Sequence, residues 1–262
     1  MSNNISPSDN QLFQNMNCAT ILSKDNALRW INDWVHFHID HHNLEGLVFF
    51  DNESDEYSIQ KLHDCLKAIS GLKQFVVLAA PFRYGTFHKA KYVHRAKFLR
   101  AALLNVARKR FFAQANAVLN IDIDELVAPI NGSNIFDETK KSLLGYRLFN
   151  GRWRHVANSP IEGVCHADHI YLTENDICSA TKYCIDPQGL LSSRPWDVHR
   201  VLNGYLNKSL LSDKIFYYHC RQITTHWKYR RESAEESQLF TDEELRQAML
   251  ATFDKRPRRI EN

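Results

Sequence analysis

Four short apolar runs, separated by stretches with helical periodicity, constrain the fold of this 262-residue chain more than any other feature. The runs cover residues 18–24, 45–52, 75–81 and 117–124. None shows the regular polar alternation of a strand with one face in water, so we expect each strand to be covered on both sides. Strands of this kind that alternate with helices form a mostly parallel sheet. The sequence therefore predicts a single α/β domain with a mostly parallel central sheet flanked by helices.

The remaining elements follow from the spacing of apolar residues. Helices are predicted over residues 25–43, 57–70, 88–111 and 242–253. The second half is less regular, and we expect strands within 142–156, 166–173, 179–186 and 214–227. We divide the chain into a disordered lead-in (1–16), a first half (17–130), a sheet-completing second half (131–250) and a basic tail (251–262). The two halves should form the two walls of one cleft.

Three carboxylates, those of Asp122, Asp124 and Glu125, stand at the end of the fourth apolar run. Ligands bind beyond the carboxyl ends of the strands in sheets of this kind. On an extended segment the side chains of Asp122 and Asp124 share one face, where they repel each other. Solvent, a basic partner or a divalent cation could compensate them. Oxygen ligands suit Mg²⁺ or Mn²⁺, which take further ligands from phosphates, so the pair predicts a metal–diphosphate site. An exposed acidic turn is the alternative.

A basic helix precedes this acidic segment. Its cationic residues are Lys91, Arg95, Lys97 and Arg100. Basic side chains beside a metal–diphosphate site would offset phosphate charge, and we assign Arg95 and Arg100 to the bound diphosphate ligand on this ground. The alternative for each of them is a solvated helix face.

Composition excludes several functional classes. The net charge of +3, from 33 Lys and Arg against 30 Asp and Glu, does not indicate a nucleic-acid partner. No apolar stretch approaches the roughly 20 residues of a membrane span, and the polar start lacks the regions of a signal peptide. The six scattered cysteines form no CxxC pair, which favours reduced thiols in the cytoplasm. The basic tail could contact an anionic membrane surface at the inner face.

A histidine cluster on the first predicted helix could suggest zinc. His38, His41 and His42 could meet on one helix face. No cysteine or carboxylate has matching spacing, so we favour a structural, hydrogen-bonded role.

Residues 23–56, "SKDNALRWINDWVHFHIDHHNLEGLVFFDNESDE", followed by "LNIDIDELV" at 119–127, resemble GT-A-type glycosyltransferases of the family-2-like and family-92-like group. That group includes bacterial polysaccharide and capsule enzymes. The resemblance implies a GT-A-like fold, a UDP- or GDP-linked sugar donor, Mn²⁺ or Mg²⁺, and a glycan or lipid-linked acceptor, with inversion at the sugar. Three departures are Asp25-Asn26, where Asn-Glu is usual, Asn32-Asp33-Trp34, where a Glu precedes Trp, and Leu126, where Phe is usual.

The resemblance also implies residue roles. Asp122 and Asp124 would hold the metal that grips the donor diphosphate. Asp51 and Asp55 would lie near the base or ribose, and Lys24 would lie by the nucleotide.

A later segment, "THWKYRRESAEES" at 225–237, matches a region that this group of enzymes tends to carry. The match makes His226 a candidate for a metal or phosphate contact. It makes Lys228 and Arg231 candidates for holding the diphosphate as it leaves. The start of a basic surface helix is the competing interpretation for Arg231.

Sugar transfer with inversion needs a base for the acceptor hydroxyl. The candidates are Asp197, Glu162 and Asp168, and we favour Asp197 because aromatic, Arg and His residues surround it in the sequence. Trp196 could stack on a sugar or pack in the core. Two other functions stay open: another metal-dependent nucleotide enzyme, such as a nucleotidyltransferase, and a non-catalytic nucleotide- or carbohydrate-binding domain. The lack of a Walker loop and of GxGxxG weighs against kinases and dehydrogenases.

Overall fold

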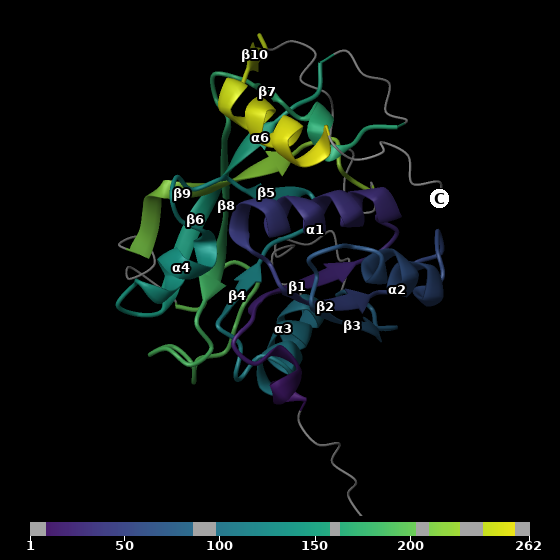
Figure 1. The fold of residues 1–262 in the computed structure, drawn as a ribbon, viewed down its shortest axis with the longest axis vertical. Helices are drawn as coiled ribbons and strands as arrows, with labels where there is room; N and C mark the ends of the chain where they lie inside the picture. The colour runs from purple at the N-terminus through teal and green to yellow at the C-terminus, as the bar shows by residue number, and fades with distance from the viewer. Residues whose placement is uncertain (1–8, 86–97, 158–162, 203–209, 226–237, 255–262) are drawn as a thin grey trace, which may run out of the picture.

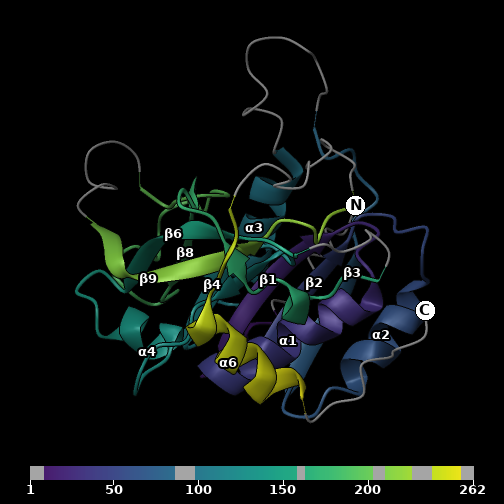
Figure 2. The same ribbon diagram turned by 90° about the horizontal axis from the view of Figure 1, so that it is seen from above.

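The computed structural model describes residues 9–85, 98–157, 163–202, 210–225 and 238–254, and one eight-stranded sheet forms its centre (Figures 1 and 2). The strands follow the order β3-β2-β1-β4-β8-β6-β9-β5 across the sheet. Their bounds are β1 (Asn17–Ser23), β2 (Gly46–Asp51), β3 (Gln74–Ala79), β4 (Ala117–Asn120), β5 (Glu125–Val127), β6 (Tyr146–Arg154), β8 (Ile177–Ile185) and β9 (Leu211–Cys220). A separate two-stranded ribbon pairs β7 (Tyr171–Leu172) with β10 (Phe240–Thr241).

The first half of the chain builds the parallel part of the sheet. β3, β2, β1 and β4 pair in parallel, and every residue of β2 and β4 is buried. They are buried because α1 (Leu28–His42) and α2 (Ile59–Lys67) pack on one face and α3 (Phe98–Arg110) packs on the other. The predicted α/β class is confirmed. The carboxyl ends of β1, β2 and β4 therefore lie at one edge.

The second half continues the same sheet with mixed directions. β8 runs antiparallel to both β4 and β6, β6 runs parallel to β9, and β5 runs antiparallel to β9. Parallel pairings still outnumber antiparallel ones. α4 (Ile135–Lys140) begins after Asn134 and α6 (Glu243–Phe253) begins after Asp242, and both preceding side chains accept hydrogen bonds from backbone N–H groups of the first helical turn. The register places Glu125 of β5 opposite His219 of β9.

Residues 9–16 differ from the predicted disordered lead-in. They include η1 (Asn10–Phe13), and Phe13 is fully buried. The ring of Phe13 packs edge-on against Phe111 and Phe112, with centroids 6.3 and 5.5 Å away. One buried aromatic side chain therefore anchors a polar segment that hydropathy alone assigns to solvent.

Two further expectations need correction. The fourth strand ends at Asn120 rather than at residue 124, because the chain turns there. Most of the strand predicted over 166–173 is η3 (His166–Asp168) and loop, with β7 as its short extended part. Residues 86–97, which hold part of the predicted basic helix, lie outside the described ranges.

α1 supports the strand that follows the acidic residues. His38 accepts a hydrogen bond from Val127 N at 3.3 Å, and His42 Nε2 donates to Val127 O at 2.9 Å. Burial lowers the pKa of His42 to about 4, which keeps it neutral for these contacts. His41 bonds Thr252 of α6 at 3.0 Å. The predicted structural role of the histidine cluster is confirmed. Among the described helices, none has the length and apolar character to cross a membrane.

Candidate functional site

The three predicted carboxylates lie in a tight turn, which we call the acidic turn (residues 122–125). Glu125 N donates to Asp122 O at 3.1 Å, and Asp122 N donates to Glu125 Oε2 at 2.7 Å. The buried Trp34 indole of α1 donates to the carbonyls of Asp122 and Glu125 at 3.0 and 2.8 Å. Because this segment turns instead of staying extended, Asp122 and Asp124 do not share the strand face that the sequence predicts.

Basic side chains compensate Asp122. Its carboxylate pairs with Arg100 of α3 and with Lys182 of β8. The Lys182 side chain is 1% exposed, and its ammonium also lies 2.9 Å from Glu125 Oε2. Burial lowers the pKa of Lys182, and the Glu125 carboxylate opposes that shift. The structure therefore gives Asp122 and Glu125 the basic partner that was one of the three sequence-based options.

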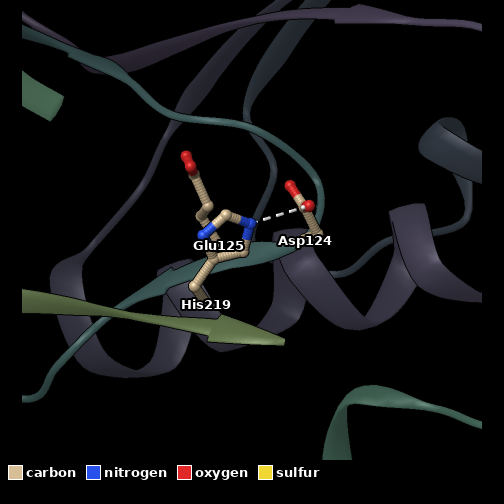
Figure 3. A group of neighbouring side chains, drawn as sticks. All are labelled: Asp124, Glu125 and His219. Carbon is tan, nitrogen blue, oxygen red and sulfur yellow. Dashed lines mark hydrogen bonds and ion pairs between the residues drawn. The ribbon is translucent and has the colours of Figure 1, made fainter. Parts of the chain in front are cut away.

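Asp124, Glu125 and His219 form a group that could hold a cation (Figure 3). One ligand atom from each of them lies within 4.8 Å of the other two. His219 Nε2 and Asp124 Oδ2 are 3.0 Å apart, which is about the separation of neighbouring corners in an octahedron with 2.1 Å bonds. Two carboxylates and one imidazole suit Mn²⁺, and the carboxylates also suit Mg²⁺. The donor set therefore fits a divalent cation. Asp122, predicted as a ligand, does not belong to this group, and Glu125 does.

The surroundings of His219 favour its protonated form. It stacks on Trp153 with centroids 4.0 Å apart, and its Nδ1 lies 3.5 Å from Cys178 Sγ. Burial lowers the pKa of His219. The charge of the Asp124 carboxylate and its hydrogen bond outweigh burial, and the net effect raises the pKa to about 9. For Cys178, burial raises the pKa, while hydrogen bonding to His219 contributes to a net lowering.

A pocket of about 300 Å³ opens at the same sheet edge. It is lined by Asp25, Ala27, Leu28, Trp30, Glu56, Tyr57, Thr224 and Thr225. These residues come from the segments after β1 and β2 and from the segment that follows β9. Asp25 Oδ1 joins the first two segments by accepting from Asp55 N at 2.6 Å and Glu56 N at 3.3 Å. The strand that carries His219 thus leads directly to a wall of the pocket.

The residues predicted to bind the nucleotide, Lys24, Asp51 and Asp55, lie at the ends of β1 and β2 or in the loops that follow them, but they do not line the pocket. Asp51 is buried and accepts a hydrogen bond from Ser54 Oγ at 2.6 Å, so it stabilises the loop that follows β2. Lys24 lies 3.5 Å from the exposed Asp55. Their neighbours in the sequence, Asp25 and Glu56, line the pocket instead.

The candidate bases are placed differently from one another. Asp197 is exposed, and its loop is tied to the end of β4 because Asn120 Nδ2 donates to Val198 O at 3.0 Å. Asp168 accepts from Cys165 N at 2.8 Å and thus stabilises its own turn. Trp196 is 1% exposed, so it packs in the core and does not offer a face to a sugar. The remaining candidates lie outside the described residues: Arg95, Glu162, His226, Lys228 and Arg231.

Sequence reasoning missed Lys182, His219 and Cys178 as members of this site. A lysine inside the otherwise apolar strand "SATKYCI" was the available signal for Lys182, because a buried lysine requires an acidic partner. His219 and Cys178 carry no comparable local signal.

No family model and no curated protein matches the sequence. Similar solved structures are GT-A-type glycosyltransferases. GalNAc-T7 with UDP, GalNAc and Mn²⁺ aligns at 12% identity and TM-score 0.45, over 79% of this chain and 44% of that one. The galactosyltransferase LgtC with donor and acceptor sugar analogs aligns at 13% and 0.36, over 65% and 58%. The mannosyltransferase PcManGT from Pyrobaculum calidifontis with GDP-Man and Mn²⁺ aligns at 13% and 0.37, over 70% and 48%.

This chain therefore spans about half the length of the solved chains that it matches. At these identities and TM-scores, the similarity does not assign an activity. A functional proposal has to come from the residues of the site.

Replacing Lys182 with Met should lower the free energy of unfolding by about 3 kcal/mol, because it leaves the buried Glu125 carboxylate without its cation. Adding Glu125→Gln to this variant should recover part of the loss. Urea unfolding measures both values. Lys214→Met, at an exposed position of β9, is the control and should change little. Equal stability of the Lys182→Met and wild-type proteins would contradict this ion pair.

The metal-free protein should lose stability as the pH rises through about 9. The pKa of His219 is raised in the folded state, so its contribution is fully present below the ordinary value of 6.5 and disappears as the proton leaves near pH 9. The stability difference between wild type and His219→Gln should therefore shrink by on the order of 3 kcal/mol between pH 6 and pH 10. Denaturant titrations in EDTA measure it. A difference that stays constant over this range would show that His219 does not carry the charge.

Proposed function

We propose that this chain is a metal-dependent glycosyltransferase that moves a sugar from a nucleotide-diphosphate donor to a glycan or lipid-linked acceptor. The observation that supports it is the juxtaposition at one sheet edge of the Asp124–Glu125–His219 group and the pocket beyond β1 and β2. A donor of this class has two parts that need different surroundings. Its diphosphate needs positive charge, and its nucleoside needs an apolar surface with a few polar groups.

The pocket has the chemistry for a nucleoside. Trp30, Leu28 and Tyr57 supply apolar and aromatic surface, and the carboxylates of Asp25 and Glu56 can accept hydrogen bonds from ribose hydroxyls. Thr224 and Thr225 place the pocket wall a few residues beyond His219. A nucleoside held here would direct its diphosphate toward the acidic turn.

Asp124, Glu125 and His219 would hold Mn²⁺ or Mg²⁺. A bound cation would supply Lewis-acid neutralisation of the leaving diphosphate. Asp122 and Arg100 pair with each other, so in this proposal they fix the shape of the turn. Arg95, Lys228, Arg231 and His226 stay candidates for phosphate or metal contacts from the sequence alone.

Asp197 is our proposed base. Its exposed carboxylate would take the proton of an acceptor hydroxyl while that oxygen bonds to the anomeric carbon. The bond from the anomeric carbon to the diphosphate oxygen would break, and the nucleoside diphosphate would leave with its electron pair. Attack from the face opposite the leaving group inverts the anomeric centre.

Nucleoside diphosphates should stabilise the protein when Mn²⁺ is present. At about 100 times the dissociation constant, binding adds roughly 2.7 kcal/mol, which corresponds to a shift of about 5 °C or more in Tm. Thermal shifts with UDP, GDP and UTP, each with and without Mn²⁺, measure this effect. Asp124→Asn should abolish the part that depends on Mn²⁺. Asp64→Asn, at an exposed position of α2, should keep it.

The same screen, together with a turnover assay of nucleotide-sugars, separates the alternative functions. A preference for UTP over UDP would favour a nucleotidyltransferase. Binding of a nucleotide-sugar without any turnover, even to water, would favour a non-catalytic binding domain. If no nucleotide raises the Tm in the presence of Mn²⁺, the proposed function is wrong.

Asp197→Ala should lower kcat by about 10²-fold or more, as expected for removal of a general base, and leave the KM for the donor little changed. Transfer of sugar to water provides the assay, with nucleotide-sugars of the nucleoside diphosphate that binds in the thermal-shift screen as donors. Asp168→Ala and Glu162→Ala are tested beside it. A near-normal kcat for Asp197→Ala would exclude this residue, and a large loss in one of the other two would move the role there.

A further inference from the structure

The imidazole ring of His219 is held on both edges and on one face. Nε2 bonds the Asp124 carboxylate at 3.0 Å, and Nδ1 contacts the Cys178 sulfur at 3.5 Å. The Trp153 ring stacks on His219 at an interplanar angle of 19°. The stacking fixes the plane of the ring, and the two hydrogen bonds fix which nitrogen faces which partner.

Asp124 alone would favour the wrong ring state for cation binding. A neutral imidazole carries one proton, and the carboxylate attracts it to Nε2, where it would donate to Asp124. That proton would block the lone pair that Nε2 has to offer a cation. The proton therefore needs an acceptor on the Nδ1 side, so that Nε2 is free.

We propose that Cys178 is a positioning residue whose sulfur accepts the Nδ1–H of His219 and thereby keeps Nε2 available to the cation. The proposal rests on the proposed function of the Asp124–Glu125–His219 group. Histidine ligands of metals commonly donate their second N–H to a carboxylate, a carbonyl or water. Here the thiol sulfur of Cys178 would be the acceptor.

The surroundings of Cys178 fit this role. The residue is 5% exposed, so water does not readily replace the sulfur. Tyr217 lies beside it, with the hydroxyl 3.9 Å from the sulfur and donating to Ala180 O at 2.9 Å. Gly151 makes room for Tyr217, because a Cβ at that glycine would lie 2.5 Å from the tyrosine ring. Cys178 Sγ lies within bonding distance of His219 Nδ1 and can accept its proton.

The test compares Cys178→Val, which removes the acceptor, with Cys178→Ser, which keeps one. Mn²⁺ binding to the full-length protein is measured by electron paramagnetic resonance, with Mn²⁺ alone and with UDP. We expect about 10- to 100-fold weaker binding for Cys178→Val, the range found when partners of metal ligands are removed. Cys178→Ser should stay closer to wild type. Cys184→Val makes the same change at another buried position of β8 and should bind Mn²⁺ like wild type.

The second measurement does not need a metal. Nitrogen-15 spectra of the metal-free protein, above the pH at which His219 becomes neutral, report which ring nitrogen carries the proton. We expect a larger fraction of His219 protonated on Nδ1 in wild type and Cys178→Ser than in Cys178→Val. Cys178→Ala replaces Cys178→Val if the latter does not fold.

The two measurements separate this inference from the proposed function. If wild type binds no Mn²⁺, the proposed function fails, and the spectra still decide the role of Cys178. If Cys178→Val keeps both the wild-type Mn²⁺ affinity and the wild-type fraction of His219 protonated on Nδ1, the inference is overturned, whatever the outcome for the nucleotide.

Discussion

The buried ammonium of Lys182 is the constraint on which the rest of the site depends. It comes from β8, in the second half of the chain, and it meets the carboxylates of Asp122 and Glu125 between β4 and β5. Charges at this depth are tolerated in proteins when they are paired and hydrogen-bonded. The pairing therefore fixes how the parallel half of the sheet joins the mixed half. From α1, the indole N–H of Trp34 donates to backbone carbonyls of the same turn, so the acidic turn is fixed on two sides.

This support decides which carboxylate can act. Asp122 is committed to Arg100 and Lys182. Asp124 has the His219 imidazole as its partner, a group that can release its Nε2 proton when a cation binds. The turn thus gives its two aspartates different partners: Asp122 pairs with Arg100 and Lys182, and Asp124 pairs with His219.

The parallel half could be predicted from the sequence because its signals are local. Apolar runs and helical spacing each span a few residues, and they located β1 to β4 and α1 to α3. The acidic turn was missed because its form depends on Glu125 N–H and side-chain contacts that interrupt an otherwise strand-like run. β5 was missed for a different reason: it exists through pairing with β9, which lies far along the chain. Phe13 likewise acts through contacts that only the folded chain provides.

Of the Asp124–Glu125–His219 group, only Asp124 was a candidate cation ligand from the sequence, for the same physical reason. Asp124 could be identified because it lies at a strand end in the sequence, where ligands are expected. Glu125 and His219 meet through strand register, and register between distant strands is set by the whole sheet. The carboxylates of the acidic turn pair with Arg100 of α3, Lys182 of β8 and His219 of β9. A divalent cation that replaced the His219 proton would leave an excess of positive charge at the edge where the pocket opens. An anionic diphosphate beside the cation would offset that charge, so the proposed function joins the cation group and the pocket in one donor site.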